Sequence, residues 1–213
     1  AVVAAIFLRY IEKASEFKSE VKTLTKEKIH SLKKTLSQLE SYFHGSSSGI
    51  DPLSILLNQP LLFRSTNDVS PVEIPAFDEN GKNVVFLLNT GLSRSTSGLV
   101  AKFHEACAKP EFKDKMDNEL VQFTNGGIQS FLDNNPTELY ANLNKLVQFQ
   151  LDEMNYLIPD QFKDAVKGGL SNGDYFLKIC GSGGGGFMLG FTQNWEKTEK
   201  ALNGLDIEVI YKY

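Results

Sequence analysis

The chain has 213 residues, enough for one large domain or two small ones with a buried core. Apolar residues make up 41% and charged residues 23%, as in ordinary globular proteins, and the net charge of −4 argues against nucleic acid as the main partner because phosphate binding favours a basic face. The two cysteines, Cys107 and Cys180, lack CxxC or histidine neighbours at metal-binding spacing, so we expect reduced thiols in a cytoplasmic protein.

The opening run AVVAAIFL is too short to span a bilayer and lacks the flanks of a signal peptide, so no membrane partner is expected. Residues 1–13 read as a helix, and this abrupt opening without Met suggests that the chain begins partway into a longer protein. A second helix is predicted from Thr25. Its apolar residues recur at helical spacing: Ile29, Leu32, Leu36, Leu39 and Phe43.

The segment HGSSSGID (44–51) ends that helix, and a short helix with Pro52 in its first turn follows over 52–59. Strands are predicted over 61–65 and 72–77. A turn over 78–83 then separates the first half of the chain from the second, and we place a domain boundary near Gly81.

The second half predicts a strand, then helices, then two strands, a helix and a last strand. The strands are expected over 83–90, 174–180, 187–192 and 206–213, and the last helix over 194–205. The helical pattern over 95–170 has expected interruptions at Pro110, Gly126–Gly127, Pro136 and Pro159. This order is the ferredoxin-like β-α-β-β-α-β unit with extra helices in its first crossover. We therefore predict an α+β protein with domains over 1–81 and 82–213.

The run KICGSGGGGF (178–187) raises three alternatives: a dinucleotide fingerprint, a Walker A loop or a flexible linker. The fingerprint must open a helix, but a β-like apolar run follows here. No Gly-Lys-Ser/Thr closes the run, which excludes a Walker A loop, and strands abut both sides, which argues against a linker. A loop between two strands remains, whose amides could form an anion-binding nest.

Three stretches together resemble the GHMP kinases, the superfamily of galactokinase, homoserine kinase, mevalonate kinase and phosphomevalonate kinase. KICGSGGGGFMLGF is similar to their third motif, FHGSSSGID to the aspartate segment of the mevalonate kinase branch, and LLNTGLSRSTSGLVAKF to another segment of that branch. The resemblance implies a GHMP kinase-like two-domain fold that uses ATP and Mg²⁺. The N-terminal ATP-binding loop of the family and its Mg²⁺ ligands have no counterpart here, so this chain by itself is expected to bind ATP poorly.

The resemblance implies that Asp51 is catalytic, orienting the acceptor hydroxyl and accepting its proton. A helix cap or Asx-turn is the alternative for this residue. Further residues are implied to bind substrate: His44, Ser47, Ser48, Arg94 and Thr96. Of these, His44 is also typical of a structural hydrogen-bonding residue, Thr96 of a helix cap and Arg94 of a solvated surface charge.

The implied phosphate loop comprises Gly181, Ser182, Gly183, Gly184, Gly185 and Gly186. Lys178, before this loop, either attracts phosphate or is a solvated lysine at the end of a strand. The sequence departs from the family at Ser47, where proline is frequent, at Ser182, which replaces alanine, and at Phe187, which replaces a small residue or cysteine. Because of these departures, the resemblance does not determine which alcohol is the acceptor.

Two functions follow from the sequence. The first is an ATP-dependent small-molecule kinase in isoprenoid biosynthesis that phosphorylates an alcohol, most simply mevalonate; phosphomevalonate, a sugar or a homoserine-like alcohol are the alternatives. The second is a GHMP-like protein that binds or regulates without turnover. Exposed helices and an incomplete first domain could favour a homodimer.

Overall fold

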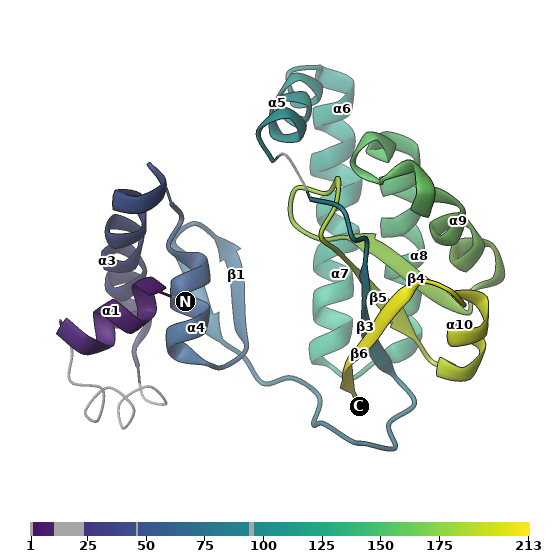
Figure 1. Cartoon of the computed structure of the whole chain (residues 1–213), viewed down its shortest axis with the longest axis horizontal. Coiled ribbons are helices and arrows are strands. Elements are labelled where there is room, and N and C mark those ends of the chain that lie inside the picture. The colour runs from purple at the N-terminus through teal and green to yellow at the C-terminus, as the bar shows by residue number, and fades with distance from the viewer. Residues whose placement is uncertain (1, 11–23, 46, 94–95) are drawn as a thin grey trace. The chain divides into compact units, whose positions relative to one another are not determined.

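The computed structural model of the protein describes residues 2–10, 24–45, 47–93 and 96–213, without the side chains of His44, Thr96 and Ser97 (Figure 1). It divides into two compact units, residues 1–74 and residues 75–213. The sequence placed the boundary near Gly81, but the stretch before Gly81 is bonded to the end of the chain. The Asp78 amide donates to the Lys212 carbonyl, and Asn83 and Tyr213 exchange two backbone hydrogen bonds.

In its described residues, the first unit combines three helices with a two-stranded hairpin. These elements are α1 (Val2–Tyr10), α3 (Lys26–His44), α4 (Ile50–Leu57), β1 (Leu61–Ser65) and β2 (Asp68–Pro71). The hydroxyl of Thr25 caps α3 by accepting a hydrogen bond from the Lys28 amide, which confirms the predicted start. Ile29 and Leu36 of the predicted stripe are fully buried, with Leu53 of α4 in the same core. Phe43, the last of the apolar residues at helical spacing, is 56% exposed and is not part of this core.

The strand predicted over 72–77 is wrong. Strand β2 comes earlier, at Asp68–Pro71, where it pairs antiparallel with β1. Beyond it the Val72 amide still donates to the Pro60 carbonyl, but the partner strand β1 begins only at Leu61, and Pro75 has no amide with which to extend a ladder.

The second unit combines one sheet with several helices. Its strands are β3 (Val84–Asn89), β4 (Tyr175–Ile179), β5 (Phe187–Thr192) and β6 (Asp206–Lys212). Its helical elements are α5 (Thr96–Cys107), α6 (Pro110–Lys115), η2 (Met116–Leu120), α7 (Val121–Leu132), α8 (Pro136–Glu153), η3 (Asn155–Leu157), η4 (Asp160–Phe162), α9 (Lys163–Asn172) and α10 (Trp195–Ala201). Two of the predicted interruptions, Pro110 and Pro136, are first residues of helices, as expected from a proline whose missing amide costs nothing there.

The predicted break at Gly126–Gly127 is wrong because α7 runs through both residues. A Cβ at Gly126 would lie 2.5 Å from Oδ1 of Asn142 on α8. This glycine therefore lets two helices approach closely instead of ending one.

The sheet has the order β4-β5-β3-β6, and each neighbouring pair is antiparallel. Strands β3 and β4 are consequently parallel to each other with β5 inserted between them. Strands β5 and β6 are likewise parallel with β3 between them. Two split β-α-β crossovers of this kind confirm the predicted β-α-β-β-α-β unit and the α+β class.

Helices cover both faces of the sheet. The ring of Phe86 stacks edge-on against Trp195 of α10, and the hydroxyl of Tyr175, on the same face, donates to the Ala165 carbonyl of α9. Phe176 points to the opposite face and stacks against Tyr140 of α8. Figure 1 accordingly shows α7 and α8 behind the strands, with α9 and α10 to one side.

None of the helices in the described ranges combines the length and the hydrophobicity needed to cross a bilayer.

Candidate functional site

Asp51 is the second residue of α4, and its side chain is exposed. The N-cap of this helix is Gly49, in the left-handed region at φ 71°, so Asp51 does not occupy the cap position. A carboxylate in a first helical turn is favoured by the helix dipole. The arrangement presents Asp51 at the start of a short helix whose inner side, at Pro52 and Leu53, is buried.

The loop before Asp51 is fixed to helix α3. A Cβ at Gly49 would lie 2.4 Å from the Lys33 carbonyl oxygen, so only glycine permits this close approach. The hydroxyl of Ser37 donates to the Ser47 carbonyl over 2.6 Å. The Ser47 hydroxyl in turn donates to the Glu40 carboxylate and accepts from the Gly49 amide over 3.0 Å.

The predicted substrate-binding residues of this loop therefore differ in their surroundings. The hydroxyl of Ser47 is occupied by Glu40 and Gly49, which assigns it to holding the loop. Ser48 is exposed and accepts a hydrogen bond from the Ile50 amide over 3.3 Å, which leaves its hydroxyl proton available. His44 is the last residue of α3, and its side chain lies outside the described residues.

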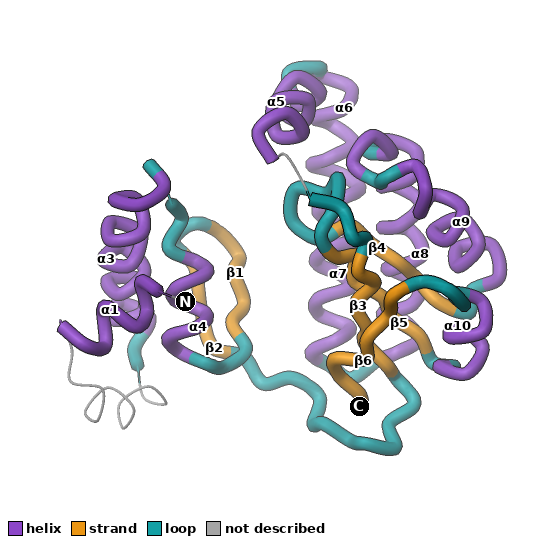
Figure 2. Tube along the Cα trace, viewed as in Figure 1, coloured by secondary structure: helices purple, strands orange, loops and turns teal. Residues whose placement is uncertain are grey.

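The glycine run forms the loop between β4 and β5, as predicted (Figure 2). Four residues of the loop have left-handed φ angles, which favour glycine over residues with a side chain: Gly181, Gly183, Gly184 and Gly186. A Cβ at Gly183 would also lie 2.6 Å from the Leu157 carbonyl oxygen, and one at Gly184 would lie 2.1 Å from Cδ1 of Leu99. Two separate segments of the second unit thus press on the loop.

Three amides of this loop already donate to carbonyl groups of the protein. Gly183 bonds to Cys180 over 3.3 Å, Gly184 to Leu157 over 2.7 Å and Gly186 to Leu92 over 3.0 Å. Among the described residues, the amides of Gly181, Ser182 and Gly185 have no such partner. The buried hydroxyl oxygen of Ser182 also has none.

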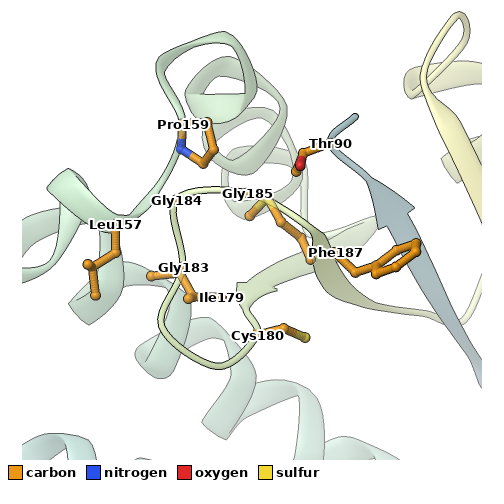
Figure 3. A pocket seen from close by; sticks show the side chains of 10 residues that line it. Thr90, Leu157, Pro159, Ile179, Cys180, Gly183, Gly184, Gly185 and Phe187 are labelled. Carbon is orange, nitrogen blue, oxygen red and sulfur yellow. The ribbon is translucent and has the colours of Figure 1, made fainter. Parts of the chain in front are cut away.

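A small pocket lies against the loop. Its walls include Leu157, Pro159, Cys180 and Thr90, with the loop glycines between them (Figure 3). The pocket leaves about 10 Å³, the room of about one water molecule. A phosphate chain therefore does not fit inside the loop as it stands, and an anion would have to meet the Gly181–Ser182 corner from outside.

Thr90 is a residue that the sequence reasoning missed. It follows β3, is 5% exposed, and its hydroxyl donates to the Gly186 carbonyl over 2.7 Å. The same oxygen accepts from the Leu92 amide over 3.3 Å. The sequence signal for Thr90 was its place in the LLNTGLSRSTSGLV segment. Within that segment only Arg94 and Thr96 were predicted to bind substrate.

Arg94 and the side chain of Thr96 lie outside the described residues; Thr96 is the first residue of α5. Lys178 lies on β4, and its ammonium group donates to the Ile179 carbonyl over 2.9 Å. Burial lowers the pKa of Lys178 below its usual value, while the nearby Cys180 has the opposite, smaller effect. The ammonium group of this lysine is therefore bonded to the backbone and shielded from solvent.

The described residues fit the implied cofactors only in part. The unbonded amides at Gly181 and Ser182, one after the other beside a left-handed glycine, are donors of the kind that form an anion-binding nest. For Mg²⁺, the described ranges contain no group of three or more acidic, histidine or cysteine side chains that could together hold a metal ion. No step involving Mg²⁺ is therefore assigned to these residues.

The sequence matches no protein-family model and no curated protein. Among solved structures, the chain is similar to the mevalonate kinase of L. major in complex with R-mevalonate, with a TM-score of 0.64 and 18% identity. It is also similar to a Lin0012 protein from Listeria innocua, with a TM-score of 0.59 and 15% identity. Both likenesses cover 99% of this chain and 65% of the other. At such identities they show the fold, which is that of a mevalonate kinase-like protein.

Proposed function

We propose that the protein is a GHMP kinase of the mevalonate kinase branch, which transfers the γ-phosphoryl group of ATP to an alcohol. The observation that carries this proposal is the likeness to a mevalonate kinase over 99% of the chain. Asp51 and the glycine loop occur within that likeness, in the stretches whose sequences resemble the family's motifs. The likeness of fold and the two motifs are needed together for this proposal, because a fold alone does not establish a function.

Asp51 is the proposed catalytic residue. In phosphoryl transfer a carboxylate within hydrogen-bond reach orients the attacking hydroxyl and takes its proton as the new P–O bond forms. Its exposure at the start of α4 supports this role, since the carboxylate is open to an acceptor. Ser48 is the neighbouring residue with a free hydroxyl proton and would bind the acceptor beside it.

The glycine loop has the second proposed role. The unbonded amides at Gly181 and Ser182 would donate to an anionic group of the bound substrates that meets this corner of the loop from outside. ATP would supply the phosphoryl group. Mevalonate is the proposed acceptor, because the mevalonate kinase that this chain resembles was crystallised with R-mevalonate.

The test is ADP formation from Mg·ATP by the purified protein with mevalonate, and then with phosphomevalonate, galactose and homoserine. ADP formed only with mevalonate supports the kinase and its acceptor. ADP formed with another alcohol retains the kinase and replaces the acceptor. The absence of ADP with all four alcohols, with the full-length gene product as the enzyme, removes the kinase activity.

A second function, binding or regulation without turnover, is favoured by one observation. Three amides of the glycine loop are bonded to protein carbonyls, so these donors are already occupied where a phosphate cradle would leave them free. Calorimetric titration with mevalonate and with Mg·ADP distinguishes this alternative. Binding of mevalonate without ADP formation would support it, and turnover would exclude it.

A further inference from the structure

The glycine loop and the end of β3 form one closed hydrogen-bonded structure. The Thr90 amide and hydroxyl both donate to the Gly186 carbonyl, over 2.9 and 2.7 Å. The Gly186 amide donates in return to the Leu92 carbonyl over 3.0 Å, and the Leu92 amide donates to the Thr90 hydroxyl. Four hydrogen bonds thus join three residues, and the Thr90 hydroxyl takes part in two of them.

The same loop also meets helix α5. Cδ1 of Leu99, on the first turn of that helix, occupies the space that a Cβ at Gly184 would take. Leu92 lies before the start of α5 and its carbonyl oxygen would be 2.7 Å from a Cβ at Gly185. The glycine loop is therefore packed against the chain both before and after the point where α5 begins.

We infer that Thr90 is a positioning residue, which makes the glycine loop and the start of α5 move as one body. A ligand that shifts the loop must displace Leu92 and Leu99, and a ligand bound beside α5 must act on the loop. Such a linkage is reciprocal. The conformation of the glycine loop would then depend on whether a ligand is bound to the segment after β3. This use for phosphoryl transfer rests on the proposed function, whereas the mechanical linkage does not.

The variant that isolates the hydroxyl is Thr90→Val, which keeps the shape of the side chain. Thr192→Val is the control. Thr192, at the end of β5, is also buried; its hydroxyl also donates to a carbonyl, that of Asp174, and also accepts from the amide two residues on, that of Asn194. Because it accepts a further hydrogen bond from the Thr198 hydroxyl, this variant removes at least as many bonds as Thr90→Val, but away from the glycine loop. Thr90→Ser, which retains the hydroxyl, is the conservative variant.

Hydrogen exchange of single amides gives a readout that does not depend on activity. The amides of Gly184 and Gly186 are bonded to Leu157 and Leu92 and not to Thr90 itself. If Thr90 holds the loop, both amides exchange roughly tenfold faster in Thr90→Val and at wild-type rates in Thr192→Val and Thr90→Ser. Faster exchange confined to Leu92, whose own acceptor was removed, would overturn the inference. Thr90→Ala serves for the same measurement if the valine variant does not fold.

A second measurement reports the linkage in binding. The affinity for mevalonate is measured with and without saturating Mg·ADP, and the ratio is expected to approach one in Thr90→Val while Thr192→Val retains the wild-type ratio. A ratio unchanged by Thr90→Val overturns the inference about ligand linkage. If the wild type binds neither ligand, the proposed function fails, and the exchange rates of Gly184 and Gly186 still decide whether Thr90 holds the loop.

Discussion

The ring of Phe86 lies directly against Gly190 on the neighbouring strand, so that a Cβ added at Gly190 would come within 2.2 Å of the ring. Phe86 is fully buried and also stacks on Trp195 of α10. The glycine thus makes room for an aromatic ring that joins the sheet to a helix. Its role is one of packing, although it follows the glycine loop closely in the sequence.

Gly190→Ala is accordingly expected to destabilise the second unit by about 1–3 kcal/mol, because the ring has no free space into which it can retreat. Urea unfolding followed by tryptophan fluorescence measures this, since Trp195 contacts the displaced ring. Gly98→Ala is the control: nothing lies within 4 Å of a Cβ at this helical position, and stability should rise by up to about 1 kcal/mol. Equal stabilities of the two variants would contradict the packing argument.

Asp51→Asn should abolish most of the turnover, by about 10²–10⁴-fold if Asp51 accepts the proton of the acceptor. The matched control is Asp164→Asn, because Asp164 is likewise exposed and likewise the second residue of a helix, α9. Both variants lose a similar small interaction with a helix dipole, about 0.3–1 kcal/mol. Only the first should lose activity in the ADP-formation assay. Equal activities would remove Asp51 from its proposed role.

Ser47→Ala should lower stability and affect acceptor affinity only through the loop. The hydroxyl bonds to Glu40 and to the Gly49 amide, so its removal is expected to cost about 1–2 kcal/mol in the unfolding free energy. Ser48→Ala, at an exposed position, should leave stability within about 0.5 kcal/mol and instead raise the KM for the acceptor. The opposite pattern would show that Ser47, and not Ser48, contacts the substrate.

Stability should fall at alkaline pH because of Tyr213. Burial raises the pKa of Tyr213 to about 12, from an ordinary value of about 10. The neutral phenol of the folded state therefore contributes stability that is fully present below pH 10. This contribution is lost as pH rises towards 12, because the unfolded chain ionises first. Burial also raises the pKa of Tyr140, on α8.

The measurement compares urea unfolding of the wild type and Tyr213→Phe at pH 9 and pH 11. The loss of stability between the two pH values should be smaller in the variant, since one of the buried phenols is gone. Tyr42→Phe is the control because Tyr42 is 88% exposed, and its loss should match that of the wild type. Identical losses in all three proteins would contradict the assignment.

Local signals in the sequence predicted much of the fold. The cap at Thr25 and the prolines at positions 110 and 136 mark the first turns of helices because they act on adjacent amides. The ferredoxin-like order followed from the succession of strands and helices alone. Gly126 was misread because its reason lies in Asn142, sixteen residues away on another helix, and not in its own backbone.

The candidate site could be predicted to a lesser extent for the same reason. The glycine loop was placed correctly between two strands, but two of the three carbonyls that occupy its amides belong to Leu92 and Leu157, far from the loop in sequence. Ser47 was assigned to substrate from its motif, yet Glu40, on the preceding helix, engages its hydroxyl. Tertiary contacts decide which amides and hydroxyls of the candidate site remain free to bind a ligand. A local sequence pattern does not reveal these contacts.

The strand order also has a consequence for synthesis of the protein. Strand β3 pairs only with β5 and β6, and its Asn89 bonds to Asp206, 117 residues later. At typical translation rates this strand waits for roughly 6–25 seconds before its second neighbour has been synthesised. Until β5 has been made, for most of that time, the apolar run VVFLLN is a strand without a partner in its sheet, the kind of segment that chaperones bind and that aggregates when they do not. Slow codons between β3 and β6 should therefore lower the yield of soluble protein more than the same codons placed after β6.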